Sequence, residues 1–266
     1  MILPFHLYGF IVGIAVVVAT TLIEKQYKKI RSSEKYFWKI IITSLVFGII
    51  GARLWHVATD YNLYIDNFKE VFFIWNGGLS IFGGILGGAM GVYLSLCFFQ
   101  NSNFFKSDGV GKKIQFLEFL DIAIFGLPIG QAIGRLGNFA NQELYGIPTN
   151  GSIFRVYISP ENRLLGYENI EYYHPLFFYE MVATIGFSIA IYYLNSKKKL
   201  PKIGTGKLFL IYTVFYSAIR FFLDFIRIDK AMLSWTNMGV NQVVLLIIAF
   251  FSLTLLLLNS YKLKKK

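Results

Sequence analysis

Seven long apolar runs divide the chain, and short polar stretches separate them. They cover residues 4–23, 39–58, 79–99, 116–138, 176–194, 207–226 and 238–259. Each run has about 20 residues, the length that an α-helix needs to cross the hydrocarbon core of a bilayer. We therefore expect an all-α polytopic bundle of about seven transmembrane helices, built as a single integral membrane domain over residues 1–266.

The composition favours the same class. Hydrophobic residues make up 55% of the 266 positions, aromatic residues 18% and charged residues 15%, and the mean hydropathy is +0.54. An ordinary soluble domain has about 25% charged residues, so this chain lacks the charged surface of a soluble globule. Its many aromatic residues exclude a disordered chain.

The Lys and Arg residues fall on alternate sides of the apolar runs. Eighteen of the 26 lie in 24–39, 100–115, 195–207 and the C-terminal tail, whereas the intervening loops hold Lys69, Arg155, Arg163, Arg227 and Lys230. Cytoplasmic loops are the ones enriched in Lys and Arg. We therefore expect the N-terminus outside, the C-terminus in the cytoplasm and an ordered extracytoplasmic loop at 139–175. The net charge of +11 then needs no nucleic-acid partner.

Three arginines fall within the apolar runs or at their outer ends: Arg53, Arg135 and Arg220. An Arg at the centre of a spanning helix costs about 2.5–3.5 kcal/mol on insertion scales. One such residue could extend its head group to the membrane surface. Three that approach the same side favour a polar cavity.

Two of these arginines belong to polar stripes that repeat at i, i+4 and i+7, which is one face of a helix. The stripes are Gln131, Arg135 and Asn138, and Arg220, Asp224 and Arg227. Asp224 can pair with either arginine of its own stripe, and one cation then remains for a ligand. The planar guanidinium suits phosphate, so the stripes predict an anion site near the outer leaflet.

Small residues also recur at intervals of four, as Gly83, Gly87 and Gly91, and as Gly126, Gly130 and Gly134. This spacing lets helices approach closely, and we expect helix packing at most of these positions. The single Cys97 excludes an intrachain disulfide and is expected to be a small buried side chain.

The stretch Gly134–Gly146 reads GRLGNFANQELYG and resembles the signature of the prolipoprotein diacylglyceryl transferase family. Four shorter pieces agree with that family in chain order: Leu7-Tyr8-Gly9, Gly51-Ala52-Arg53, His174-Pro175 with Tyr179-Glu180, and Arg220-Phe221 through Asp224-Phe225 to Arg227. The resemblance covers about residues 5–245. It implies a seven-helix topology with the N-terminus outside, in agreement with the charge pattern.

The resemblance implies a bacterial plasma-membrane transferase that uses neither a cofactor nor a metal. Its partners would be the lipid bilayer, phosphatidylglycerol and lipobox-containing preprolipoproteins. The diacylglyceryl group would move to the lipobox cysteine thiol, and glycerol phosphate would leave. The catalytic residues implied are Arg135, Arg220, Glu143 and Tyr8, with Arg135 and Arg220 on the phosphate. The substrate-binding residues implied are Asn138, Asn141, Arg53, Asp224, Arg227 and His174.

One departure from the family pattern concerns the thiol-activating base. In the stretch 75–84, WNGGLSIFGG, family members typically carry His or Tyr where this chain has Phe82, and often Asp where it has Asn76. Phe neither accepts a proton nor donates a hydrogen bond. Other candidate bases are His56, His174, Glu143 and Tyr8, although His174-Pro175 also suits a turn. The alternatives are a weakened paralogue that binds phospholipid or lipoprotein, and an anion transporter.

Overall fold

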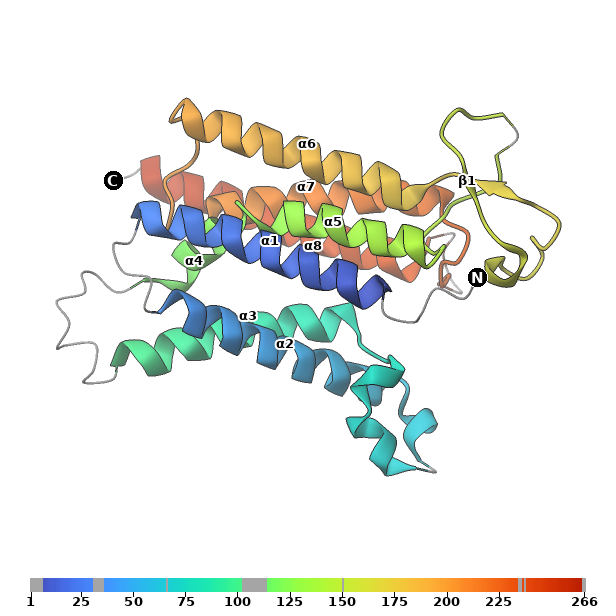
Figure 1. The fold of residues 1–266 in the computed structure, drawn as a ribbon. Coiled ribbons are helices and arrows are strands. Elements are labelled where there is room, and N and C mark those ends of the chain that lie inside the picture. The colour runs from blue at the N-terminus through green and yellow to red at the C-terminus, as the bar shows by residue number, and fades with distance from the viewer. Residues whose placement is uncertain are drawn as a thin grey trace. The chain divides into compact units, whose positions relative to one another are not determined.

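The computed structural model describes residues 7–30, 36–65, 67–101, 114–149, 151–233, 236 and 238–264. Its α-helices (Figure 1) are α1 (Leu7–Ile30), α2 (Phe37–Thr59), α3 (Ile81–Asn101), α4 (Phe116–Ala123), α5 (Leu127–Ala140), α6 (Leu176–Ser196), α7 (Lys207–Leu223) and α8 (Val240–Lys264). The short 3-10 helices are η1 (Tyr61–Tyr64), η2 (Phe68–Phe72), η3 (Ile74–Asn76), η5 (Pro160–Asn162) and η6 (Asp224–Ile226). Two strands, β1 (Val156–Tyr157) and β2 (Tyr172–Tyr173), complete the described elements.

The helices confirm the predicted all-α polytopic class. Among the described residues six helices are long and apolar enough to cross a membrane, and the number is seven if the bent pair of α4 and α5 counts as one span. Apolar runs form helices in a bilayer because every backbone N–H and C=O must find a partner within the segment. The orientation of the bundle stays a prediction.

The run predicted at 116–138 is not one straight helix. It breaks between Ala123 and Leu127, and its two halves differ in direction by 52°. Pro128 at the start of α5 has no N–H to continue a helical hydrogen bond, which explains the break.

The first run also ends later than predicted, because α1 continues to Ile30. Three lysines assigned to a loop therefore lie on this helix, and Glu24 pairs with Lys28 at 3.4 Å, an i, i+4 contact that stabilises helices. The other predicted basic positions at 31–35, 102–113 and 265–266 lie outside the described residues.

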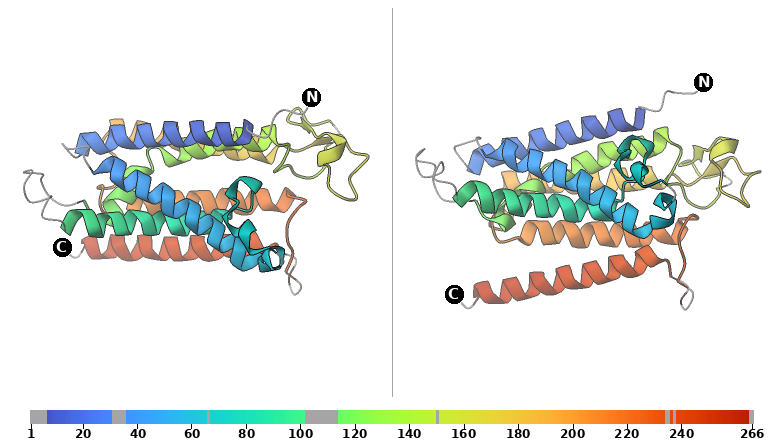
Figure 2. Two further views of the ribbon diagram at one scale, coloured as in Figure 1. Left: turned by 60° about the horizontal axis from the view of Figure 1, so that its bottom comes forward. Right: turned by 90° about the horizontal axis from the view of Figure 1, so that it is seen from below.

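Two compact units make up the chain. The first comprises residues 1–23 and 120–266, and in it α5 packs on α6 while α7 and α8 lie side by side (Figure 2). Gly126 approaches α1 so closely that an added Cβ would lie 2.2 Å from the Ala19 carbonyl oxygen, as the glycine spacing predicted. At Gly134 an added Cβ would meet nothing within 4 Å, so Gly134 is not one of the positions where close packing requires glycine.

The loop between α5 and α6 is ordered over its described residues. Strands β1 and β2 pair antiparallel, with Val156 opposite Tyr173. Tyr173 is fully buried in a cluster with Tyr145, Ile158 and Phe177. This cluster holds the loop against the start of α6, because Phe177 belongs to that helix.

The second unit comprises residues 24–119, and it is built on the helix pair α2 and α3. An added Cβ at Gly51 would lie 2.4 Å from the Gly83 carbonyl oxygen, and one at Gly87 would lie 2.2 Å from the Phe47 carbonyl oxygen. The glycine interval therefore brings these two helices into backbone contact, as predicted. Cys97 on α3 is partly exposed rather than buried.

Candidate functional site

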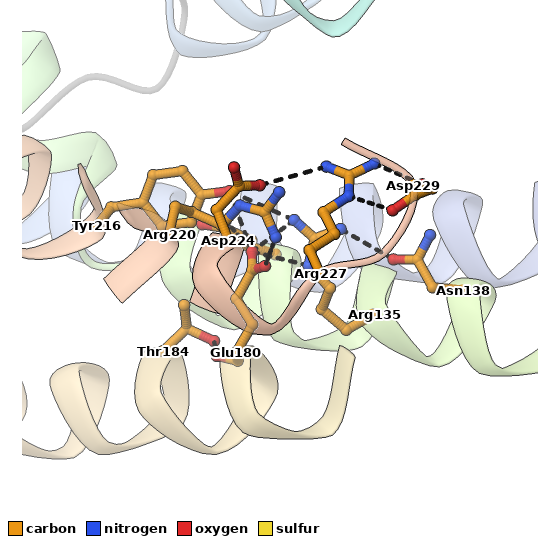
Figure 3. Close-up of polar contacts among 10 residues, drawn as sticks. Arg135, Asn138, Glu180, Thr184, Tyr216, Arg220, Asp224, Arg227 and Asp229 are labelled. Carbon is orange, nitrogen blue, oxygen red and sulfur yellow. Dashed lines mark hydrogen bonds and ion pairs between the residues drawn. The ribbon is translucent and has the colours of Figure 1, made fainter. Parts of the chain in front are cut away.

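A buried carboxylate, Glu180 on α6, forms the centre of the polar cluster in the first unit (Figure 3). Its Oε1 accepts hydrogen bonds from Arg135 Nε at 2.8 Å and Nη2 at 2.5 Å. The same oxygen also accepts from Gln131 Nε2 and from the Tyr216 hydroxyl, each at 3.0 Å. Its Oε2 accepts from Arg220 Nη1 at 3.0 Å. The two arginines from α5 and α7 therefore lie on one carboxylate.

Glu180 was absent from the predicted site, although the sequence carried a signal for it. It is the one acidic residue in the apolar run 176–194, and a charge within a spanning helix is costly unless it has a partner. The predicted stripes contained three partners of this charge, Gln131, Arg135 and Arg220, but not Glu180 itself.

Arg135 is held firmly on both sides of its guanidinium. In addition to Glu180 it donates from Nη1 to Asn138 Oδ1 at 2.8 Å. Asn138 then donates to Glu143 Oε1 at 3.0 Å, and Asn141 donates to the same oxygen at 3.4 Å. A continuous chain of hydrogen bonds thus joins four predicted site residues to Glu180.

Arg220 is held at one point. Within the described part of the chain its single hydrogen bond is the one from Nη1 to Glu180, and its side chain is 12% exposed. A guanidinium has five N–H donors, so Arg220 keeps donors for a ligand. The predicted alternative, a pair between Arg220 and Asp224, does not form.

Asp224 lies in η6 and is almost fully buried. Its nearest cation is Arg227, with Nη1 at 3.9 Å from Oδ1, and its carboxylate accepts no hydrogen bond from the described residues. Arg227 is committed elsewhere, because Nε and Nη2 donate to the two oxygens of Asp229 at 2.5 and 2.7 Å. Asp229 was not among the predicted residues.

This bidentate pair perturbs both of its members. The hydrogen bond to Asp229 raises the pKa of Arg227, although burial opposes the rise. Burial opposes ionisation of Asp229, but the hydrogen bond and the charge of Arg227 outweigh it and hold the pKa of Asp229 below its ordinary value. Arg227 therefore contributes its charge to the site, with Nε and Nη2 both bonded to Asp229.

Glu143 is presented by a strained turn. The residues on either side of it, Gln142 and Leu144, have φ angles of 53° and 58°, a left-handed conformation that costs roughly 1–3 kcal/mol for a side-chain-bearing residue. Gln142 Oε1 accepts hydrogen bonds from the backbone N–H and the hydroxyl of Ser159, at 2.7 and 2.5 Å. These two hydrogen bonds stabilise the turn. Glu143 lines a cavity of about 260 Å³, together with Asp229.

Tyr8 and His174 differ in their surroundings. The Tyr8 ring packs on the motif glycine Gly137, where an added Cβ would lie 2.8 Å from the ring, and Tyr8 is 40% exposed. His174 shares a hydrogen bond of 2.9 Å with the Tyr179 hydroxyl. Its backbone carbonyl also accepts from the Gly146 N–H at 2.8 Å. His174 thus joins the motif loop to the start of α6, as expected of a turn residue.

Arg53 belongs to the second unit and is buried there. Its guanidinium donates to four backbone carbonyls, those of Glu70, Val71, Gly77 and Gly78. These contacts hold the segment between α2 and α3 and occupy most donors of Arg53. Asn76 lies in the same segment, and its side chain is outside the described part of the structure.

The second unit also carries Phe82 and the candidate base His56. Phe82 is 42% exposed, and its ring centroid lies 6.2 Å from that of Trp55. His56 Nδ1 shares a hydrogen bond of 3.0 Å with the Tyr64 hydroxyl, while its Nε2 lies 3.9 Å from Asp60 Oδ2. A titratable histidine with polar partners is therefore present on α2.

Comparisons with known proteins agree across nearly the whole chain. A family model described as prolipoprotein diacylglyceryl transferase matches residues 1–258. Phosphatidylglycerol–prolipoprotein diacylglyceryl transferases from Listeria innocua serovar 6a and Synechocystis are each 32% identical, over 259 and 255 residues. These matches cover 96% and 95% of this chain and 86% and 82% of those proteins. The protein of that name from Enterococcus faecalis is 32% identical over 247 residues, 92% of this chain and 83% of its own length.

Proposed function

Because this chain belongs to the prolipoprotein diacylglyceryl transferase family, we propose that it transfers the diacylglyceryl group of phosphatidylglycerol to the lipobox cysteine of a prolipoprotein. The cysteine sulfur forms a thioether bond with the terminal glyceryl carbon. The bond between that carbon and the phosphate oxygen breaks, and glycerol phosphate leaves with the electron pair. The enzyme works as a multi-pass protein of the bacterial plasma membrane.

The observation that supports this function best is the pair of arginines on Glu180. Charge grows on the phosphate as the carbon–oxygen bond breaks, and donors aimed at growing charge lower the barrier. Arg220 is attached through one of its donors, so its remaining N–H groups serve the phosphate. Arg135 is attached to both Glu180 and Asn138 and supplies fixed positive charge beside it.

The carboxylates have separate roles in this proposal. Glu143 receives a hydroxyl of the glycerol head group, with Asn138 and Asn141 orienting its Oε1. Asp224 orients Arg227 from a buried position. Tyr8, packed on the motif glycine, borders the reacting groups, and His174 holds the motif loop in place.

Thiol activation is the step in which this chain departs from the family pattern. A cysteine thiol has a pKa of about 8.5, so a few per cent is thiolate at pH 7. Loss of a general base slows a reaction by about a hundred- to ten-thousand-fold. With Phe82 in place of a proton acceptor, we infer a working but slow transferase that uses thiolate already present. Glu143, which Asn138 links to Arg135, is the alternative base that we propose.

Incubation of the purified protein with phosphatidylglycerol and a lipobox peptide tests the function, with the peptide mass as the readout. The expected result is a mass gain of one diacylglyceryl group. Arg220→Lys should lose most of this product, because a lysine cannot donate two parallel hydrogen bonds to phosphate. The exposed Arg155 offers a matched control, and Arg155→Lys should retain turnover. Bound phosphatidylglycerol without any product would favour the binding paralogue instead.

A further inference from the structure

Two further residues are linked to Glu180 by hydrogen bonds, one directly and one through the other, and the family signature used above includes neither. Gln131 on α5 donates from Nε2 to Glu180 Oε1 at 3.0 Å. The Tyr212 hydroxyl on α7 donates to Gln131 Oε1. We propose that Gln131 and Tyr212 are positioning residues, which fix the Glu180 carboxylate and through it Arg135. The proposal rests on the transferase function proposed above.

The chemistry of the three groups allows one arrangement. An ionised carboxylate accepts hydrogen bonds and donates none, so Gln131 turns its NH2 group toward Glu180 and its carbonyl oxygen toward Tyr212. Tyr212 must then donate. Tyr212 is 8% exposed, and a buried hydroxyl that loses its acceptor destabilises the fold. The relay therefore resists rotation of the amide.

The relay acts on one side of the carboxylate. Glu180 Oε1 accepts from Gln131, from Tyr216 and twice from Arg135, whereas among the described residues Oε2 accepts from Arg220 alone. Arg135 is thus part of a rigid network that joins α5, α6 and α7, and Arg220 can turn toward a phosphate. Gln131 and Tyr212 therefore keep Arg135 in place while Arg220 turns toward the phosphate.

This division predicts a specific kinetic signature. Removing Gln131 or the Tyr212 hydroxyl leaves both arginines charged, so attraction of the anionic lipid persists. The guanidinium of Arg135 loses its alignment, and a displacement of about 1 Å can cost a hundredfold in rate. The effect should therefore fall on kcat rather than on KM.

The first experiment measures turnover of a lipobox peptide by Gln131→Leu and Tyr212→Phe. We expect kcat to fall about 10- to 100-fold in both, with KM for phosphatidylglycerol within about threefold of the parent. The double variant should be no slower than Gln131→Leu, because the two side chains act as one relay. Tyr192→Phe is the matched control, since it removes a tyrosine hydroxyl that donates to the Phe125 carbonyl at 2.8 Å. It should keep the parental kcat.

The second experiment uses Gln131→Glu and a pH series. The new carboxylate repels Glu180, but when protonated it can donate to Glu180 as the amide does. The charged or titratable groups that face this position are Glu180, Arg135, Tyr212 and Tyr216. The ratio of variant to parental kcat should rise as the pH falls from about 8 to about 6. A general structural defect would leave this ratio flat.

Binding of glycerol phosphate by calorimetry separates this proposal from the proposed function. The released product carries the phosphate charge that the transition state develops, so misaligned arginines should weaken its binding about tenfold in Gln131→Leu. A parent that binds glycerol phosphate but makes no product would refute the transferase function, while the tenfold difference would still support the positioning role. Thermal unfolding confirms that each variant is folded. Folded Gln131→Leu and Tyr212→Phe proteins with parental kcat and parental binding would overturn the proposal.

Discussion

Replacing Glu180 with Gln tests the carboxylate on which both arginines lie. The amide oxygen can take the place of Oε1 and keep the contacts with Arg135. The amide NH2 then replaces Oε2, which lies 3.0 Å from Arg220 Nη1 in the parent protein. Two hydrogen-bond donors would therefore face each other at this position. A charge-assisted hydrogen bond is lost, at about 1.5–3 kcal/mol. The positive charges of two partly buried arginines also lose their compensation, for which about 3–5 kcal/mol is typical when the pair is fully buried.

We expect Glu180→Gln to lose about 3 kcal/mol of stability and at least a hundredfold in turnover, because each 1.36 kcal/mol of lost alignment is a factor of ten in rate. The rate at which lipidated peptide forms, followed by its mass, measures the turnover. Thermal unfolding in the same detergent measures the stability. Glu161→Gln is the control, since Glu161 is exposed on η5. Turnover within about threefold of the parent, with unchanged unfolding, would refute the reasoning that Glu180 organises the site.

Three further predictions address thiol activation, topology and pH. Turnover should rise from about pH 6 toward the thiol pKa of about 8.5, and Phe82→His should raise it at neutral pH or leave it unchanged; product from the variant alone, at any pH, would identify a chain that has lost catalysis. In a background without the native cysteine, Leu165→Cys, at a position 93% exposed, should react with an impermeant thiol reagent from outside, and Lys199→Cys only from the cytoplasmic side; the reverse pattern would invert the topology. The pKa of Asp229 is lowered in the folded protein, so its contact with Arg227 stabilises the fold above the unfolded pKa of about 3.9 and is lost as the pH falls through the folded value; the thermal midpoint should therefore decrease less on acidification in Asp229→Asn than in the parent.

Local sequence was enough to predict the helices and those contacts of the site that lie within a single helix. A spanning helix depends on about 20 consecutive apolar residues, so six runs appeared where long helices lie. The contact between Arg135 and Asn138 at 2.8 Å joins residues three apart on one helix, where side chains always face each other. The glycine interval likewise predicted the contact of α2 with α3, because small residues on one face permit it.

The partner of Arg220 was decided by tertiary structure. Spacing suggested Asp224, four residues away, but α7 ends at Leu223 and continues as the tighter η6. The two side chains no longer stack as they would in an α-helix, and Arg220 instead contacts Glu180, 40 residues earlier in the chain. In the same way Arg227 pairs with Asp229 beyond the helix, and Arg53 donates hydrogen bonds to backbone carbonyls. Sequence spacing describes one helix at a time, so the charges that meet across α5, α6 and α7 become known only when those helices are packed together.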